Sequence, residues 1–207
     1  MARAAAFRRG PFRARDEQGS GQRAPTRQNE NCCARSRVFA PFRAAWYHAA
    51  VPHAEGSDCW KMSENEQNNL FYVCSLIEFV GRKTKNRRGN VVAAMDDACL
   101  GHQLEYADVN HSLPFERVSD ELISECGIKE GTFDTITGCR YSIPTVTSIG
   151  RVYSTLIEET DEGDVGQSLR KVFGSFISDE ISDFANGVYY QNPSYLLESF
   201  KAGRLLR

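Results

Sequence analysis

A chain of 207 residues with 41% hydrophobic residues is long enough to bury the core of one domain, and its formal net charge is only -2. No run approaches the roughly 18 consecutive apolar residues of a membrane-spanning helix, and arginines interrupt the first residues, where a secretory signal would be apolar. Seven cysteines at irregular spacing do not suggest a disulfide framework, so we expect reduced thiols, a cytoplasmic location and no membrane contact.

The small net charge conceals a division of the chain near residue 61. Residues 1–61 carry ten Arg and one Lys against five acids, whereas residues 62–207 carry fourteen Lys and Arg against twenty-two acids. The first segment is rich in Ala, Gly and Pro, and it shows no sustained helical or strand period. This asymmetry predicts two parts with different origins.

Residues 1–61 have three interpretations: an organellar transit peptide, a disordered basic arm that binds nucleic acid, or upstream sequence translated in frame ahead of a natural start at Met62. The third is favoured, because the composition changes abruptly after Met62 to that of a folded helical protein. Glu55-Gly56-Ser57, just upstream, can be encoded by a purine-rich run that is typical of a ribosome-binding site. We therefore predict a disordered basic arm over 1–61 and a single globular domain over 62–207.

The first predicted helix spans residues 68–81. Its apolar side chains follow helical spacing and extend beyond one stripe, which is typical of a helix that is central in a core or covered by a partner. A glycine and a run of basic residues then close it, because cations are favoured in the last turn of a helix. A second short helix is expected from Gly89-Asn90 to a break at Gly101, and a third over residues 102–110.

Helix start and stop signals divide the remainder of the chain. Residues 129–143 form the one stretch without a clear helical period, and an extended loop or a short hairpin is expected there. Capping residues, prolines and glycines place the other helices at 112–126, 144–157, 165–184 and 192–203. The predicted fold is therefore all-α, a compact bundle of about six or seven helices with one irregular stretch.

The basic run lies within GRKTKNRRGN, residues 81–90. It contains Arg82, Lys83, Lys85, Arg87 and Arg88. One interpretation is an exposed helix end and turn that binds an acidic protein surface, which includes a second copy of the domain. The alternative is a helix-turn-helix-like segment at 82–110 that binds DNA. The would-be recognition helix at 102–110 has two carboxylates and no Lys or Arg, so a protein is the favoured partner and nucleic acid the less favoured one.

Tyrosines near the C-terminus form a second candidate interaction site. Tyr189, Tyr190 and Tyr195 surround the start of the segment NPSYLLESF. Tyrosine combines an apolar body with a polar tip and is favoured at protein interfaces. The same rings also suit the docking of the last helix onto the core, so both interpretations stay open.

Motifs for metals, cofactors and catalysis are incomplete. Cys99 and His102 have a ligand-like spacing, but a structural zinc site needs a second pair at a defined spacing. Cys139 stands beside an arginine and His111 is a candidate base, yet no catalytic motif surrounds either residue. The glycines sit singly at helix ends rather than in a phosphate-binding loop. We predict no metal, no cofactor, no catalytic residue and a non-enzymatic protein.

A family resemblance is carried by the stretches LFYVCSLIEFVGRKTKNRRGNVV, YADVNH, FDTITGCRYSIPTVTSIGRVY and VYYQNPSYLLESFKAG. They resemble an uncharacterised family of small cytosolic proteins from anaerobic Gram-positive bacteria, encoded among other small genes, some of them toxin-like. The resemblance covers residues 62–207 only, and it implies an operon component without assigned catalytic residues. The function expected is protein–protein interaction, as an accessory or antitoxin-like operon component. The alternative is a DNA-binding transcriptional regulator.

Overall fold

The computed structural model describes residues 61–207, so the predicted basic arm, apart from Lys61, lies outside the described residues. Within 61–207 the chain forms nine α-helices and one short 3-10 helix, and this part contains no strand. The predicted all-α fold is therefore confirmed. None of the helices between residues 61 and 207 combines the length and the apolar character needed to cross a membrane.

The helices follow one another along the chain with short connections, except for the long loop before α6. They are α1 (Glu64–Lys83), α2 (Arg88–Ala94), α3 (Asp97–Glu105), α4 (Ala107–Asn110), α5 (Phe115–Glu125), α6 (Val146–Glu158), α7 (Val165–Phe173), α8 (Phe176–Ser182), the 3-10 helix η1 (Val188–Tyr190) and α9 (Pro193–Ala202).

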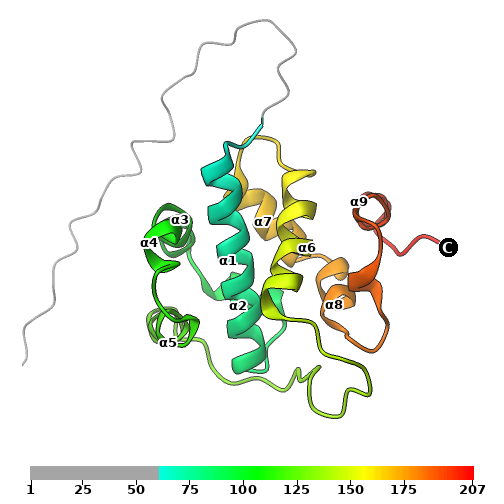
Figure 1. Cartoon of the computed structure of the whole chain (residues 1–207), viewed down its shortest axis with the longest axis horizontal. Coiled ribbons are helices and arrows are strands. Elements are labelled where there is room, and N and C mark those ends of the chain that lie inside the picture. Colours follow the sequence, from blue (N-terminus) through cyan, green and yellow to red (C-terminus); the bar gives the residue numbers. More distant parts are fainter. Residues whose placement is uncertain (1–60) are drawn as a thin grey trace, which may run out of the picture. The chain divides into compact units, whose positions relative to one another are not determined.

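Helix α1 lies at the centre of the bundle, side by side with α6 (Figure 1). Helices α3, α4 and α5 pack on one side of it, and α8 and α9 lie beyond α6 on the other side. Leu70, Val73, Leu76, Ile77 and Val80 of α1 are fully buried. The wide apolar surface of this helix is thus covered by its own chain, which resolves the choice between a core position and a partner surface.

Small residues allow α1 and α6 to approach each other closely. A Cβ atom added to Gly150 of α6 would lie 2.9 Å from the backbone N and Cα of Ser75 on α1. Such a distance is closer than real Cβ atoms come to other atoms, so only glycine fits at this position. Ser75 turns its hydroxyl inward along its own helix, where it donates to the carbonyl of Phe71 at 2.8 Å.

The predicted helix break at Gly101 is wrong. Asp96 starts a new helix instead, because its side chain caps α3 by accepting a hydrogen bond of 2.7 Å from the backbone N–H of Cys99. Gly101 then lies inside α3, where a side chain would meet nothing within 4 Å. A capping residue directly before the helix therefore outweighs a glycine in its interior.

The long helix predicted over 165–184 is also divided. It breaks at Gly174 and Ser175, between α7 and α8. A Cβ atom on Gly89, in the first turn of α2, would lie 2.6 Å from the carbonyl oxygen of Phe173 at the end of α7. The absence of a side chain at Gly89 thus allows α2 to approach α7 closely at the point where the helix breaks.

The loop before α6 is irregular, as predicted, and the hairpin alternative does not form. Part of its backbone pairs with the turn after α1. The N–H of Gly131 donates to the carbonyl of Thr84, and the N–H of Phe133 donates to that of Lys85, both at 2.8 Å. This pairing fixes the loop beside the basic run.

Candidate functional site

The basic run pairs with carboxylates of its own chain. All five of its side chains lie within salt-bridge distance of an Asp or Glu. Lys83 contacts Asp120 of α5 at 2.7 Å, and Lys85 contacts Glu130 of the following loop at 3.3 Å. Much of the positive charge of the run is therefore neutralised within the molecule.

Two of the arginines converge on Glu78, which is completely buried in α1. Arg88 donates to its carboxylate from Nε at 2.8 Å and from Nη2 at 2.9 Å, and Arg82 donates from Nε at 2.6 Å. Burial lowers the pKa of Arg88, but the hydrogen bonds to Glu78 together with the negative charges of Glu78 and Asp179 and the interaction with Tyr153 outweigh burial, so the pKa is raised. The three side chains form a buried ionic cluster at the end of α1.

The prediction that the whole run is exposed is wrong for Arg88, whose side chain is only 1% exposed. Its position at the first residue of α2 directs it back toward α1. Gly81 makes room for it, because a Cβ atom there would lie 2.9 Å from Cδ of Arg88. The sequence signal that identifies this cluster is Glu78, a single carboxylate within the apolar stretch LIEFV.

Lys83, Lys85 and Arg87 remain the accessible members of the run, with side chains that are 34%, 47% and 50% exposed. Arg87 forms an ion pair with Asp179 of α8. Its guanidinium also lies over the ring of Phe133, 4.6 Å from the ring centre. Arg87 thus connects the basic run to α8 and to the loop before α6.

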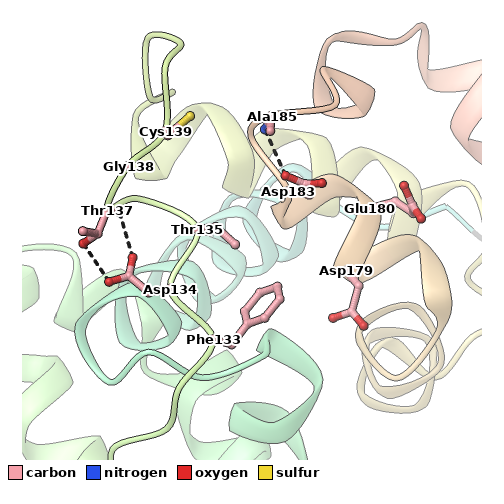
Figure 2. A pocket seen from close by; sticks show the side chains of 10 residues that line it. All are labelled: Phe133, Asp134, Thr135, Thr137, Gly138, Cys139, Asp179, Glu180, Asp183 and Ala185. Carbon is pink, nitrogen blue, oxygen red and sulfur yellow. Dashed lines mark hydrogen bonds between the residues drawn. The ribbon is translucent and has the colours of Figure 1, made fainter.

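A groove of about 450 Å³ lies next to this contact, between the loop 133–139 and α8 with its following turn (Figure 2). We call it the acidic groove. Its lining residues are Phe133, Asp134, Thr135, Thr137, Gly138, Cys139, Asp179, Glu180, Asp183 and Ala185. Four of them carry carboxylates, of which Asp179 is paired with Arg87, so a ligand of this groove meets a surface of net negative charge.

The carboxylate of Asp134 holds the loop in shape. In Figure 2 it turns toward Thr137 of its own loop. It accepts hydrogen bonds from the backbone N–H and the hydroxyl of Thr137 and from the N–H of Ile136, at 2.8 to 2.9 Å. These bonds lower the pKa of Asp134 to about 2. Asp134 is therefore charged at neutral pH and acts in the folding of the loop.

The wall of the acidic groove that faces this loop carries carboxylates that can accept further hydrogen bonds. Glu180 accepts a hydrogen bond from Asn186 at 2.9 Å, and Asp183 accepts one from the N–H of Ala185 at 3.0 Å. A carboxylate has about four acceptor sites, so one such bond leaves capacity for a ligand. The hydroxyl oxygen of Thr135 is buried and has no hydrogen-bond partner within the described residues. The groove can thus bind a cationic group through several hydrogen bonds.

The three predicted tyrosines differ in their surroundings, although the rings of Tyr189 and Tyr190 have centres only 4.4 Å apart. Tyr189 is 7% exposed and packs edge-on against Phe184, with ring centres 5.6 Å apart, and the hydroxyl of Tyr195 donates to the carbonyl of Leu206 at 2.8 Å. These two rings therefore help to anchor the C-terminal segment. Tyr190 is 77% exposed. The 3-10 helix η1, to which Tyr189 and Tyr190 belong, packs on α8, and Asp179 and Glu180 of α8 line the acidic groove.

The residues considered for metal binding and catalysis do not come together. Within residues 61–207, no group of three or more His, Cys, Asp and Glu side chains is arranged to hold a metal ion. His102 stacks on Tyr106, and His111 packs edge-on against Tyr72 of α1. Neither histidine lines the acidic groove, where Cys139 lies.

Comparison of the chain with family models, with curated proteins and with solved structures finds no match. The resemblance to small proteins of anaerobic Gram-positive bacteria therefore stays a prediction.

Proposed function

We propose that the protein acts by binding another protein, and that the acidic groove with the neighbouring Tyr190 is its binding face. The observation that carries the proposal is the groove itself, which has a volume of about 450 Å³ and is lined by four carboxylates. Exposed tyrosine beside a charged recess is a combination that favours protein recognition, because the ring adds apolar contact area at low entropic cost.

The partner of this face is a protein segment that carries Lys or Arg. Residues 62–207 contain twenty-two acids against fourteen basic residues, so the domain as a whole attracts cationic partners. This differs from the sequence-based hypothesis, in which the basic run itself was the main binding element. Arg82 and Arg88 are engaged with buried Glu78, and the accessible Arg87 stands at the edge of the groove, where it pairs with Asp179.

The biological setting is part of the same proposal. We infer an accessory or antitoxin-like component of a bacterial operon, acting in the cytoplasm without catalysis. The support for this setting is the resemblance of residues 62–207 to small operon-encoded proteins. An antitoxin-like role requires tight binding to one protein, and an acidic groove suits it because many partners that act on nucleic acids present basic surfaces.

DNA binding by residues 82–110 receives little support from the charges of this segment. Arg88 is buried, and α3 and α4 carry Asp97, Glu105 and Asp108. The side chain of Asp97 is 98% exposed. Because neutralisation of phosphates supplies much of the affinity for DNA, exposed carboxylates on this face oppose it.

Affinity capture of a tagged full-length chain from a native bacterial lysate, followed by mass spectrometry, tests the proposal. Glu180→Lys and Tyr190→Ser alter the binding face, while Glu121→Lys on α5 and Tyr106→Ser are controls of matched chemistry elsewhere. We expect wild type and both controls to retain the same basic partner and the groove variants to lose it. Equal retention by Glu180→Lys and Glu121→Lys would refute the assignment of the groove. Sedimentation of the purified chain identifies the case in which the partner is a second copy.

A further inference from the structure

Two cysteines from different helices meet in the described part of the chain. Cys99 lies in the first turn of α3, and Cys126 directly follows α5, yet their Sγ atoms are only 3.0 Å apart. Both side chains are half-buried against the core. The sulfur atoms of a disulfide lie about 2.0 Å apart, so the two Sγ atoms must approach each other by about 1 Å for the bond to form.

The other described cysteines have different surroundings. Cys74 is fully buried in α1, and Cys139 lines the acidic groove, where no second thiol is found among the lining residues. The close approach therefore singles out one pair. Sequence spacing alone does not reveal it, because Cys99 and Cys126 are 27 residues apart in the chain.

We propose that Cys99 and Cys126 form a reversible disulfide that ties α3 to the end of α5, which makes this pair a site of oxidation by small-molecule disulfides. The reduced pair is the form that a reducing cytoplasm maintains. Oxidation closes a loop from residue 99 to residue 126, which contains α4 and α5. The covalent link restricts the unfolded chain, so oxidation raises the midpoint of thermal unfolding.

The reaction is a thiol–disulfide exchange in two steps. The thiolate of one cysteine attacks a sulfur of the small disulfide, forms a mixed disulfide and releases one small thiolate. The second cysteine loses its proton to solvent and attacks the protein sulfur of the mixed disulfide, which releases the second small thiolate. In sum, two protein thiols are oxidised by two electrons to one disulfide, and one small disulfide is reduced to two thiols.

The surroundings of the two cysteines determine how fast the disulfide forms. Burial, followed by the hydrogen bond and charge of Cys126 and by the charges of Asp96 and Glu125, raises the pKa of Cys99 to about 12. Asp97, in the same turn, is paired with Arg170. The thiolate of Cys99 is therefore scarce at neutral pH, and disulfide formation is slow there and accelerates with increasing pH.

Peptide mapping of the reduced full-length chain after exposure to oxidised glutathione tests the proposal. Trypsin separates the two cysteines, because residues 89–117 contain only Cys99 and residues 118–129 contain only Cys126. Free thiols are blocked by alkylation before digestion, and the experiment is repeated in concentrated urea. In the native protein, we expect the peptides joined through Cys99 and Cys126 to be the most abundant disulfide-linked peptides of the described cysteines. In urea, we expect this pair to be no more abundant than other pairs.

Variants provide the second measurement. Cys99→Ser and Cys126→Ser should each abolish the linked peptides and the rise in the unfolding midpoint, whereas Cys139→Ser should preserve both. Linkage should also form faster at mildly alkaline than at neutral pH. The proposal is overturned if native Cys99 and Cys126 yield only separate glutathione adducts, or if they are linked no more often than in urea. The mapping of the wild-type chain decides this outcome even where a variant fails to fold.

Discussion

Replacement of Arg88 by methionine removes the central contact of the buried ionic cluster while it keeps much of the side-chain volume. Arg88 is 1% exposed and makes two hydrogen bonds, of 2.8 and 2.9 Å, to the fully buried carboxylate of Glu78. Removal of one partner from a buried ion pair costs about 3–5 kcal/mol, because the other charge is left without compensation. Glu78 retains Arg82 at 2.6 Å, so we expect the lower end of this range, about 3 kcal/mol.

The reciprocal change should cost more. Glu78→Leu leaves Arg88 and Arg82 close together without their shared carboxylate, and we expect a loss of about 5 kcal/mol. The double variant Glu78→Leu/Arg88→Met should be less destabilised than the sum of the two single variants, because each change removes the charge that the other leaves unpaired. The arrangement thus predicts a clear departure from additivity.

Urea unfolding of the full-length chain, followed by far-ultraviolet circular dichroism, measures these differences. Arg117→Met is the control, since Arg117 is 65% exposed and pairs with Glu121 on the surface of α5. It should change the free energy of unfolding by less than about 0.5 kcal/mol. An effect of Arg88→Met as small as that of Arg117→Met, or additive effects of Glu78→Leu and Arg88→Met, would contradict the assigned role of the buried cluster.

Two further predictions follow from local geometry. Gly150→Ala would place a Cβ atom 2.9 Å from the backbone of Ser75, so it should destabilise the protein by about 1–3 kcal/mol. The added Cβ of Gly101→Ala meets nothing within 4 Å, so this change should stabilise α3 by about 0.5–1 kcal/mol. Equal midpoints of thermal unfolding for the two variants would contradict this prediction. The pKa of Asp134 is lowered from 3.8 to about 2 in the fold, so its support of the loop is complete above pH 3.8 and is lost as the pH falls through about 2. In nuclear magnetic resonance spectra, the chemical shift of the Thr137 amide should change with a midpoint near pH 2 in the wild type, and this change should be absent in Asp134→Asn. A midpoint near pH 3.8 would contradict the role of Asp134 in holding the loop.

Features that depend on local sequence were predictable. The wide apolar surface of the first helix indicated a central position, which α1 occupies. The pair Asn192-Pro193 and the later Gly203 delimit α9 as expected, with Asn192 as the N-cap and Gly203 in the left-handed conformation. A helix cap depends on residues within one helical turn, so it can be recognised from the sequence alone.

Features that depend on distant contacts were not predictable. The residues adjacent to Arg88 in the sequence are polar, which predicted a position on the surface. Only the folded chain brings its guanidinium to Glu78. The acidic groove combines residues 133–139 with residues 179–185. No periodicity links segments so far apart, and the contact between Cys99 and Cys126 arises in the same way.

Fluorescence anisotropy tests most directly whether the acidic groove, and not the basic run, is the binding face. A labelled Lys- and Arg-rich peptide and a labelled duplex DNA are titrated separately with the full-length chain at the same ionic strength. We predict that the chain binds the peptide more tightly than the duplex, and that Glu180→Lys weakens peptide binding much more than Glu121→Lys does. Tighter binding to the duplex that weakens steeply with salt, or equal effects of the two reversals, would contradict the assignment of the groove.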